Sequence, residues 1–203
     1  LELKRRGVSF VSLAPRFVGD FEKGIDYKGD LTDFESDLRK HFDIAQAFGP
    51  YKISIHSGSD KFSIYPAISR VCGDLLHVKT SGTSYLEALR TVCRSEPTLF
   101  AEIAHYCIGR FEEDKKSYHI SVTPDFIRGL RVREDSRSLE DTFLDHNQGR
   151  QILHVTFGSV LSKGTCANGR SFRDAILEAL VKEDDLHTEL LVKHLGKHLQ
   201  LLS

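Results

Sequence analysis

The feature that most constrains the fold is an alternation of short β-rich runs with helical stretches. Each β-rich run is closed by a loop containing Pro, Gly or Ser, and the four runs are residues 8–14, 51–56, 75–80 and 117–122. Apolar residues spaced near 3.6 residues predict a helix over 31–48. Further helices are expected over 84–94, 97–111 and 172–202. Strands that alternate with helices of this length predict βαβ units and a parallel sheet.

Two segments carry local signals for helices. The run from Ser84 to Glu87 has the S-x-x-E pattern of a capping box, so we expect a helix to start at Ser84. Residues 151–161 could form a fifth strand. However, Asp145 and Asn147 upstream can cap a helix, and we favour a helix there.

The strands are expected to carry apolar side chains on one face and polar side chains on the other. His56, His77 and His119 fall on the polar face near the carboxyl ends of three runs. Helices cover both faces of a doubly wound sheet, whereas the inner face of a (β/α)8 barrel holds the active site at that end. We therefore predict an α/β fold, the C-terminal half of a (β/α)8 (TIM-like) barrel with a C-terminal helical extension. Residues 1–137 would form strand–helix units and residues 138–203 would be mainly helical, within one catalytic domain.

Composition narrows the class of protein. The 28 Lys and Arg stand against 29 Asp and Glu, so the basic excess that a nucleic-acid binder needs is absent. No apolar run approaches the roughly 18 to 20 residues of a membrane helix. The four Cys show no CxxC spacing, which favours reduced thiols and a cytoplasmic protein. The 203 residues contain no Met, which favours a piece of a longer protein.

Five motifs follow one another along nearly the whole chain. They are Ala14–Gly19, Lys23–Tyr27, His56–Pro66, Lys79–Ala88 and Arg150–Gly158. In this order they resemble the tagaturonate epimerase (tagaturonate/fructuronate epimerase) family of bacterial hexuronate catabolism, with one departure at Ser81, where many members have Ala. The resemblance implies a (β/α)8-like barrel, a divalent metal, and interconversion of D-tagaturonate with D-fructuronate. It also implies that the chain matches about the C-terminal half of a family member.

The two sugar acids differ at one hydroxyl-bearing carbon that is β to the ketone, so the ketone does not directly acidify the proton there. The expected route is retro-aldol cleavage, rotation of the aldehyde and re-addition, through an enediolate bound to Zn, Mn or a similar ion. A transient oxidation would serve as well, but the chain has no GxGxxG fingerprint for a nicotinamide. A related metal-dependent sugar aldolase or isomerase, and a non-catalytic sugar-acid-binding module, are the alternatives. We expect no nucleic-acid or membrane partner, and a homo-oligomer remains open.

Imidazole nitrogens suit such a metal, so the expected ligands are His56, His77 and His119. Each could instead be a hydrogen-bonded core residue. His194 and His198 have the i, i+4 spacing of a metal pair, but the glutamate of an HExxH motif is replaced by Leu195. We expect these two His on a solvated helix face.

The remaining candidates lie in the loops after the strands. The catalytic candidates are Glu22, Asp26 and Lys79, of which Glu22 and Asp26 could be acid/base groups and Lys79 could also bind the substrate carboxylate. The substrate carboxylate needs a cation together with N–H or O–H donors. The candidates for substrate binding are Arg16, Ser57, Asp60, Lys61, Thr83 and Ser84. Ordinary salt bridges and βα turns would use the same residue types.

Overall fold

The computed structural model describes residues 2–55 and 59–203 and forms two compact units. The first, here called the sheet unit, comes from Leu1–Phe21, Asp26–Thr80 and Lys197–Ser203. The second, the helical unit, comes from Glu22–Ile25 and Ser81–Gly196. Each unit is described by itself.

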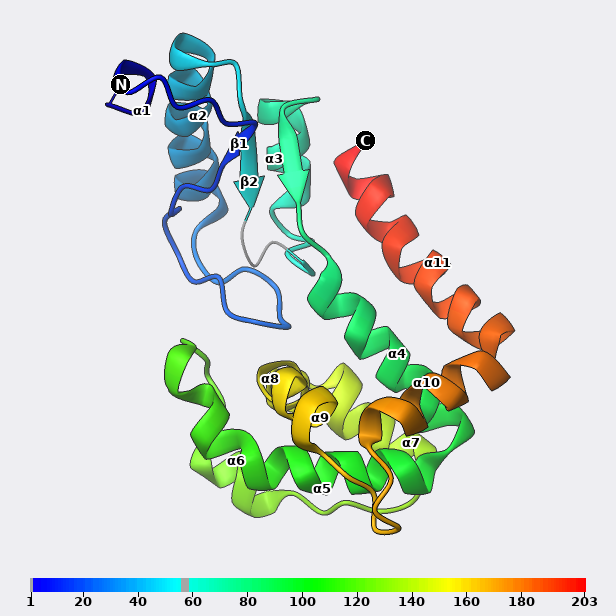
Figure 1. Cartoon of the computed structure of the whole chain (residues 1–203). Helices are drawn as coiled ribbons and strands as arrows, with labels where there is room; N and C mark the ends of the chain where they lie inside the picture. The colour runs from blue at the N-terminus through cyan, green and yellow to red at the C-terminus, as the bar shows by residue number, and fades with distance from the viewer. Residues whose placement is uncertain (1, 56–58) are drawn as a thin grey trace. The chain divides into compact units, whose positions relative to one another are not determined.

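The sheet unit is a small α/β structure. Its elements in chain order are α1 (Glu2–Arg5), β1 (Ser12–Leu13), α2 (Leu31–Phe48), β2 (Lys52–Ile55), α3 (Tyr65–Cys72) and β3 (Leu76–Val78). The strands are parallel in the order β1-β2-β3, and Ser54 of β2 lies opposite His77 of β3. Helices α2 and α3 contact each other as well as the sheet, so they cover the same face (Figure 1). Right-handed crossovers between successive strands produce this arrangement.

Helix α2 forms as its sequence predicts. The Asp30 carboxylate caps it by accepting hydrogen bonds from the backbone amides of Thr32 (2.8 Å) and Asp33 (3.0 Å). Its buried stripe begins at Phe34, whose ring packs against Phe17 and other aromatic rings of the sheet unit. This aromatic cluster anchors α2 in the core of the sheet unit.

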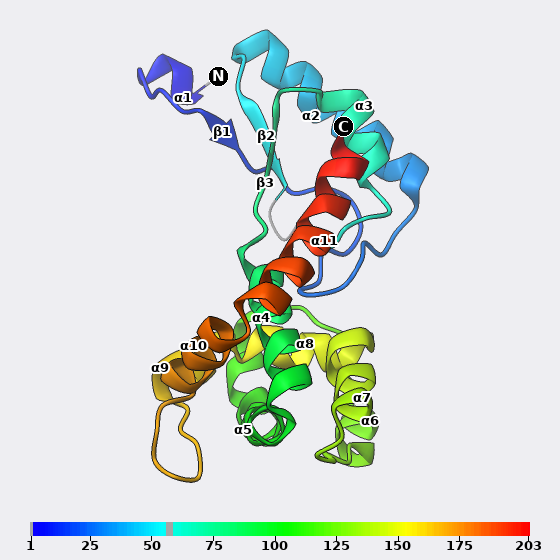
Figure 2. The ribbon, with the colours of Figure 1, turned by 90° about the vertical axis from the view of Figure 1, so that its right-hand side faces the viewer.

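The helical unit is built around one central helix. Its elements are α4 (Ser81–Ser95), α5 (Pro97–Asp114), η1 (Lys115–Ser117), α6 (Pro124–Gly129), α7 (Ser136–Leu139), the π-helix η2 (Glu140–Asp145), α8 (Asn147–Val155), α9 (Phe157–Lys163), α10 (Phe172–Lys182) and most of α11 (Asp184–Leu202). Helix α5 packs against α4, α7, α8 and α9, and Figure 2 looks nearly along its axis. Within the part of the chain that the structure describes, no helix is long and apolar enough to cross a membrane.

The predicted half-barrel is wrong. The described residues form a three-stranded sheet and many helices, and the predicted fourth strand, 117–122, is irregular after η1. The backbone amides of Ser121 and Thr123 donate to the side-chain oxygens of Gln151 (3.2 Å) and Gln148 (2.7 Å) on α8. These side chains satisfy the donors that a neighbouring strand would otherwise have to satisfy.

The polar strand face that favoured a barrel has a simpler explanation. Ser54 and His77 lie on the same face, as predicted, and the Ser54 hydroxyl is 2.9 Å from Nδ1 of His77. Two adjacent polar side chains that bond each other do not require the interior of a barrel. The shared polar face of β2 and β3 is therefore present, but it does not belong to a barrel.

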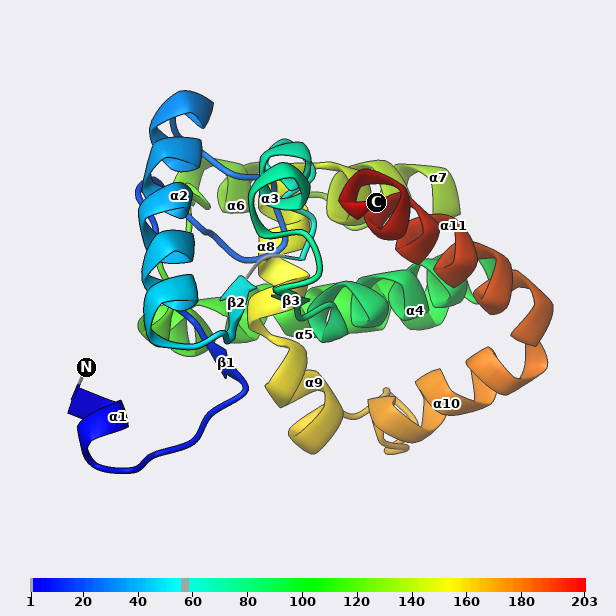
Figure 3. The same ribbon diagram turned by 90° about the horizontal axis from the view of Figure 1, so that it is seen from above.

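Several of the predicted helices, unlike the predicted barrel, are present in the structure. Helices 31–48 and 97–111 are confirmed as α2 and α5, and 151–161 is helical, in α8 and α9. Helix α4 starts at Ser81 instead of Ser84, and the Glu87 carboxylate pairs with Arg90 at 3.2 Å. The predicted helix 172–202 is interrupted at Glu183, whose φ and ψ of −112° and 40° separate α10 from α11 (Figure 3).

Replacement of Phe34 by Ala should strongly destabilise the sheet unit. The ring is fully buried, and its removal leaves a cavity among other aromatic rings, so we expect a loss of about 3–5 kcal/mol. Urea denaturation followed by circular dichroism measures this loss. The matched control is Phe48→Ala on the same helix, which is 37% exposed and should cost about 1 kcal/mol or less. Equal losses for the two variants would contradict the described core.

A largely buried ion-pair network connects α4 to η2 in the helical unit. The Arg90 guanidinium contacts Glu140 (2.5 Å) and Asp145 (2.9 Å) as well as Glu87, and Arg94 contacts Glu140 at 2.6 Å. Burial alone would raise the pKa of Glu140, but hydrogen bonds from Arg94 and Arg90 outweigh it and lower that pKa below its ordinary value. The network therefore favours the charged carboxylate in the folded state.

The helical unit should lose stability at acid pH through Glu140. Because the folded-state pKa of Glu140 is lowered, its contribution is complete above the unfolded-state pKa of about 4.3 and is lost as the pH falls through the folded-state value. Urea midpoints measured from pH 7 to pH 3 should fall below about pH 4. Arg90→Met should cost about 3–5 kcal/mol at pH 7 and flatten this decline.

The control for this pH experiment is Arg128→Gln, since Arg128 and its partner Asp125 are both exposed. An exposed pair contributes about 1 kcal/mol or less. If the urea midpoints of the Arg90 and Arg128 variants fell equally steeply at acid pH, the Glu140 network would not be the source of the decline.

Candidate functional site

Each unit contains a buried carboxylate beside an imidazole. In the helical unit, a carboxylate oxygen of Glu22 and a ring nitrogen of His119 lie within 4.8 Å of each other. In the sheet unit, Oδ1 of Asp60 lies 3.5 Å from Nε2 of His198. Glu22 and Asp60 are each only 4% exposed. Buried carboxylates of this kind need polar partners, and such groups are frequent in functional sites.

Ser121 and Gln151 of the helical unit both donate to the Glu22 carboxylate. The Ser121 hydroxyl lies 2.5 Å from both carboxylate oxygens, and Nε2 of Gln151 donates to Oε2 at 2.6 Å. Gln151 is itself fully buried on α8. The carboxylate therefore has a fixed orientation, although Glu22 lies in a loop.

The Glu22–Ile25 segment is anchored to α8 by its backbone as well. Nε of Arg150 donates to the carbonyl oxygen of Gly24 at 2.7 Å. Gly24 has a φ of +74°, and a Cβ atom there would come within 3.4 Å of the His154 ring. A residue without a side chain is favoured at such a position, because L-residues rarely adopt this φ. The first part of the motif Lys23–Tyr27 thus contacts the motif Arg150–Gly158 within the helical unit.

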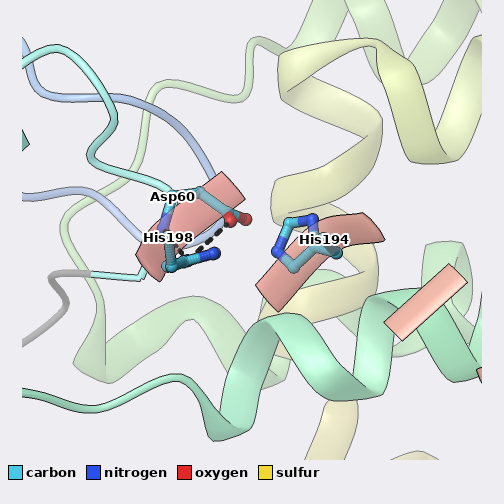
Figure 4. A group of neighbouring side chains, drawn as sticks. All are labelled: Asp60, His194 and His198. Carbon is cyan, nitrogen blue, oxygen red and sulfur yellow. Dashed lines mark hydrogen bonds and ion pairs between the residues drawn. The ribbon is translucent and has the colours of Figure 1, made fainter. Parts of the chain in front are cut away.

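The Asp60–His198 pair lies in an aromatic environment in the sheet unit. Asp60 has a φ of +61°, and its backbone amide donates to Nε2 of His198 at 3.4 Å. The rings of Phe62 and Tyr65 lie 4.9 Å and 5.5 Å from the imidazole. Burial, with the nearby Asp60 charge, raises the pKa of the Tyr65 phenol, which therefore stays protonated. Figure 4 shows Asp60 beside His198, with His194 one turn earlier on the same helix.

The expectation that His198 lies on a solvated helix face is wrong, because this side chain is 3% exposed. Leu201 and Leu202, in the last turn of α11, pack against the core of the sheet unit. Lys197 lies against one of these aromatic rings, with its Nζ 3.9 Å from the centre of the Phe62 ring. A lysine beside His198 in the sequence suggested solvent, but the charge of Lys197 lies over an aromatic ring.

Of the three predicted metal ligands, two lie in the part of the chain that the structure describes. His56 lies outside the described residues, as does Ser57. His77 is exposed on β3 of the sheet unit, with its Nδ1 2.9 Å from the Ser54 hydroxyl. His119 is exposed in the irregular segment of the helical unit, where a ring nitrogen lies within 4.8 Å of a carboxylate oxygen of Glu22. Their role as ligands stays a prediction.

The other catalytic candidates, Asp26 and Lys79, are exposed rather than buried. The Asp26 carboxylate accepts hydrogen bonds from the amide (3.2 Å) and the hydroxyl (2.9 Å) of Ser63, so it secures the turn before α3. Lys79 is exposed between β3 and α4. Both residues stay candidates, but Asp26 also has an evident structural task.

The substrate-binding candidates divide by burial. Asp60 and Lys61 are buried in the sheet unit, whereas Arg16 of that unit is exposed. In the helical unit, Thr83 is fully buried in the first turn of α4, and Ser84 is half-buried. Among these candidates, Arg16 has the exposure that contact with a soluble ligand requires.

Sequence reasoning missed Gln148 and Gln151 altogether. Their side chains hold segment 121–123, and Gln151 also holds Glu22. The available signal was their i, i+3 spacing in a segment expected to be helical, which places two amides on one helix face. That spacing alone does not identify what the amides bind.

His198→Ala should destabilise the sheet unit by about 2–3 kcal/mol, because it leaves a cavity and removes the acceptor of the Asp60 amide. The shift of the urea midpoint of the protein measures the effect. Gln200→Ala, an exposed position on the same helix, is the control and should change stability by about 0.5 kcal/mol or less. If His198→Ala were as mild as the control, the buried Asp60–His198 pair would contribute little.

Comparison with known proteins identifies the family. A family model described as tagaturonate epimerase matches residues 1–202. A Thermotoga maritima protein named tagaturonate/fructuronate epimerase is 47% identical over 201 residues, which are 99% of this chain and 40% of that protein.

Two crystal structures of fructuronate-tagaturonate epimerase UxaE from Cohnella laeviribosi, one native and one complexed with glycerol, are similar as well. They match with TM-scores of 0.87 and 0.88 at 40% identity, over 99% of this chain and 40% of theirs. The chain thus spans about two fifths of the length of these relatives. The match over nearly the whole chain confirms the resemblance that the five motifs indicated, and the chain belongs to the tagaturonate epimerase family.

Proposed function

We propose that the protein containing this chain is a metal-dependent epimerase that interconverts D-tagaturonate and D-fructuronate. The observation that carries the proposal is the family match over residues 1–202, together with relatives that are named for this activity. Because the chain spans 40% of those relatives, the activity is proposed for the longer protein. A sugar acid is the corresponding substrate.

Retro-aldol chemistry accounts for this reaction without a redox cofactor. A base removes the proton of the hydroxyl on the reacting carbon, and the bond from that carbon to the carbon beside the ketone breaks. The electron pair of this bond remains on the ketone fragment as an enediolate, while the reacting carbon becomes an aldehyde. Rotation of the aldehyde, re-formation of the bond on its other face and return of the proton give the epimer.

A divalent metal such as Zn or Mn would supply Lewis-acid stabilisation of the charge on the ketone fragment. Glu22 and His119 of the helical unit fit such an ion, because carboxylate oxygen and imidazole nitrogen are suitable ligands and lie within 4.8 Å of each other. In the sheet unit, His77 also fits. The contact between its Nδ1 and the Ser54 hydroxyl is typical of the outer contacts that orient a ligating imidazole.

Two exposed cations are suited to the substrate. Arg16 of the sheet unit can bind a carboxylate through two parallel N–H bonds, which a lysine cannot do. Lys79, exposed before α4, is our candidate for moving the hydroxyl proton. Asp26 is the second candidate for this step, and its bonds to Ser63 hold its carboxylate in place.

The full-length protein should convert D-tagaturonate to D-fructuronate, as measured by chromatography. EDTA should abolish the conversion, because it removes the Lewis acid, and added Mn or Zn should restore it. Glu22→Gln should lower kcat by about 100-fold or more if the carboxylate holds the metal. The control is Glu112→Gln, an exposed position at the end of α5, which should retain wild-type activity.

The alternatives give different results in the same assay. Accumulation of three-carbon fragments without the epimer would indicate a sugar aldolase. Binding of the sugar acid without turnover or bound metal would indicate a binding module. No product in the presence of added Mn or Zn would overturn the epimerase proposal.

A further inference from the structure

We propose that Gln151 is a positioning residue that, with Ser121, fixes the Glu22 carboxylate for binding a divalent metal. The inference rests on the proposed function, because it assigns a task to groups around one proposed ligand. It concerns only residues of the helical unit, and the contacts that carry it are direct hydrogen bonds.

The first observation is that both ends of the Gln151 amide are used. Nε2 donates to Oε2 of Glu22 at 2.6 Å, and Oε1 accepts from the backbone amide of Ser121 at 3.2 Å. A charged carboxylate only accepts and a backbone amide only donates, so the amide group of Gln151 has one satisfactory orientation. Gln151 itself is fully buried.

Ser121 closes the three residues into a ring of hydrogen bonds. Its hydroxyl donates to the Glu22 carboxylate, 2.5 Å from both oxygens, while its backbone amide donates to Gln151. Each member of the ring thus restrains the other two. A carboxylate oxygen is a suitable ligand for a divalent cation, so a Glu22 held in this way presents such a ligand in a defined orientation.

Gln148 extends the same arrangement by one turn of α8. Its side-chain oxygen accepts from the backbone amide (2.7 Å) and the hydroxyl (3.2 Å) of Thr123. Two glutamines three residues apart on a helix therefore hold two amides that are two residues apart in an extended segment. That segment carries His119, which lies beside Glu22.

Partners that bond to a metal-ligating carboxylate orient it and typically change metal affinity by about 10- to 100-fold. Gln151 and Ser121 have this relation to Glu22, whereas Gln148 holds only the neighbouring segment. Loss of Gln151 should therefore weaken metal binding through Glu22, and loss of Gln148 should have a smaller effect.

The experiment is a double-mutant cycle on Mn²⁺ affinity, measured by titration calorimetry on the metal-free full-length protein. Gln151→Leu keeps a similar volume but removes both hydrogen bonds, and we expect the Kd for Mn²⁺ to rise about 10- to 100-fold. Glu22→Gln should raise the Kd at least as much. The double variant should bind no more weakly than Glu22→Gln alone, because Gln151 acts through Glu22.

Gln148→Leu is the matched control on the same helix, and its Kd should rise less than that of Gln151→Leu. Ser121→Ala provides a second test if Gln151→Leu does not fold, and its effect should also vanish in the presence of Glu22→Gln. Additive effects on the Kd, or wild-type affinity in both the Gln151 and Ser121 variants, would overturn the inference. Failure of the proposed function is a separate result, because a wild-type protein that binds Mn²⁺ would then leave D-tagaturonate unchanged.

Discussion

The bonds from two backbone amides to glutamine side chains determine the organisation around Glu22. Extended backbone normally satisfies its N–H groups in a sheet, but Ser121 and Thr123 use Gln151 and Gln148. An irregular segment can therefore lie against α8 without a partner strand. The Glu22 carboxylate joins this arrangement from a distant part of the sequence, so one helix organises two separate segments of chain.

The sheet unit is organised by strand pairing and by helix packing. Its parallel strands pair in chain order, and right-handed crossovers bring α2 and α3 to the same face. Ser54 and His77 place polar atoms in register between neighbouring strands, where they bond each other. Aromatic rings around Phe34 fill the space under α2.

The sequence predicted what local rules control and missed what distant side chains control. The capped, periodic stretch 31–48 is helical as expected, because its signals lie within its own residues. Segment 117–122 has the composition of a strand, yet its amides are taken by glutamines about 25 to 30 positions later. The lysines near His198 in the sequence predicted a solvated position, although its imidazole lies against Phe62 and Tyr65, far away in the sequence. The five motifs identified the family, but no local rule could show how their side chains meet.

The Asp60–His198 contact joins residues 138 positions apart. The sheet unit therefore completes its core with residues 197–203, after the whole helical unit has been added to the chain. During synthesis, the strands and their two helices would emerge long before the last turns of α11. The sheet unit therefore cannot complete its core until residues 197–203 have been synthesised.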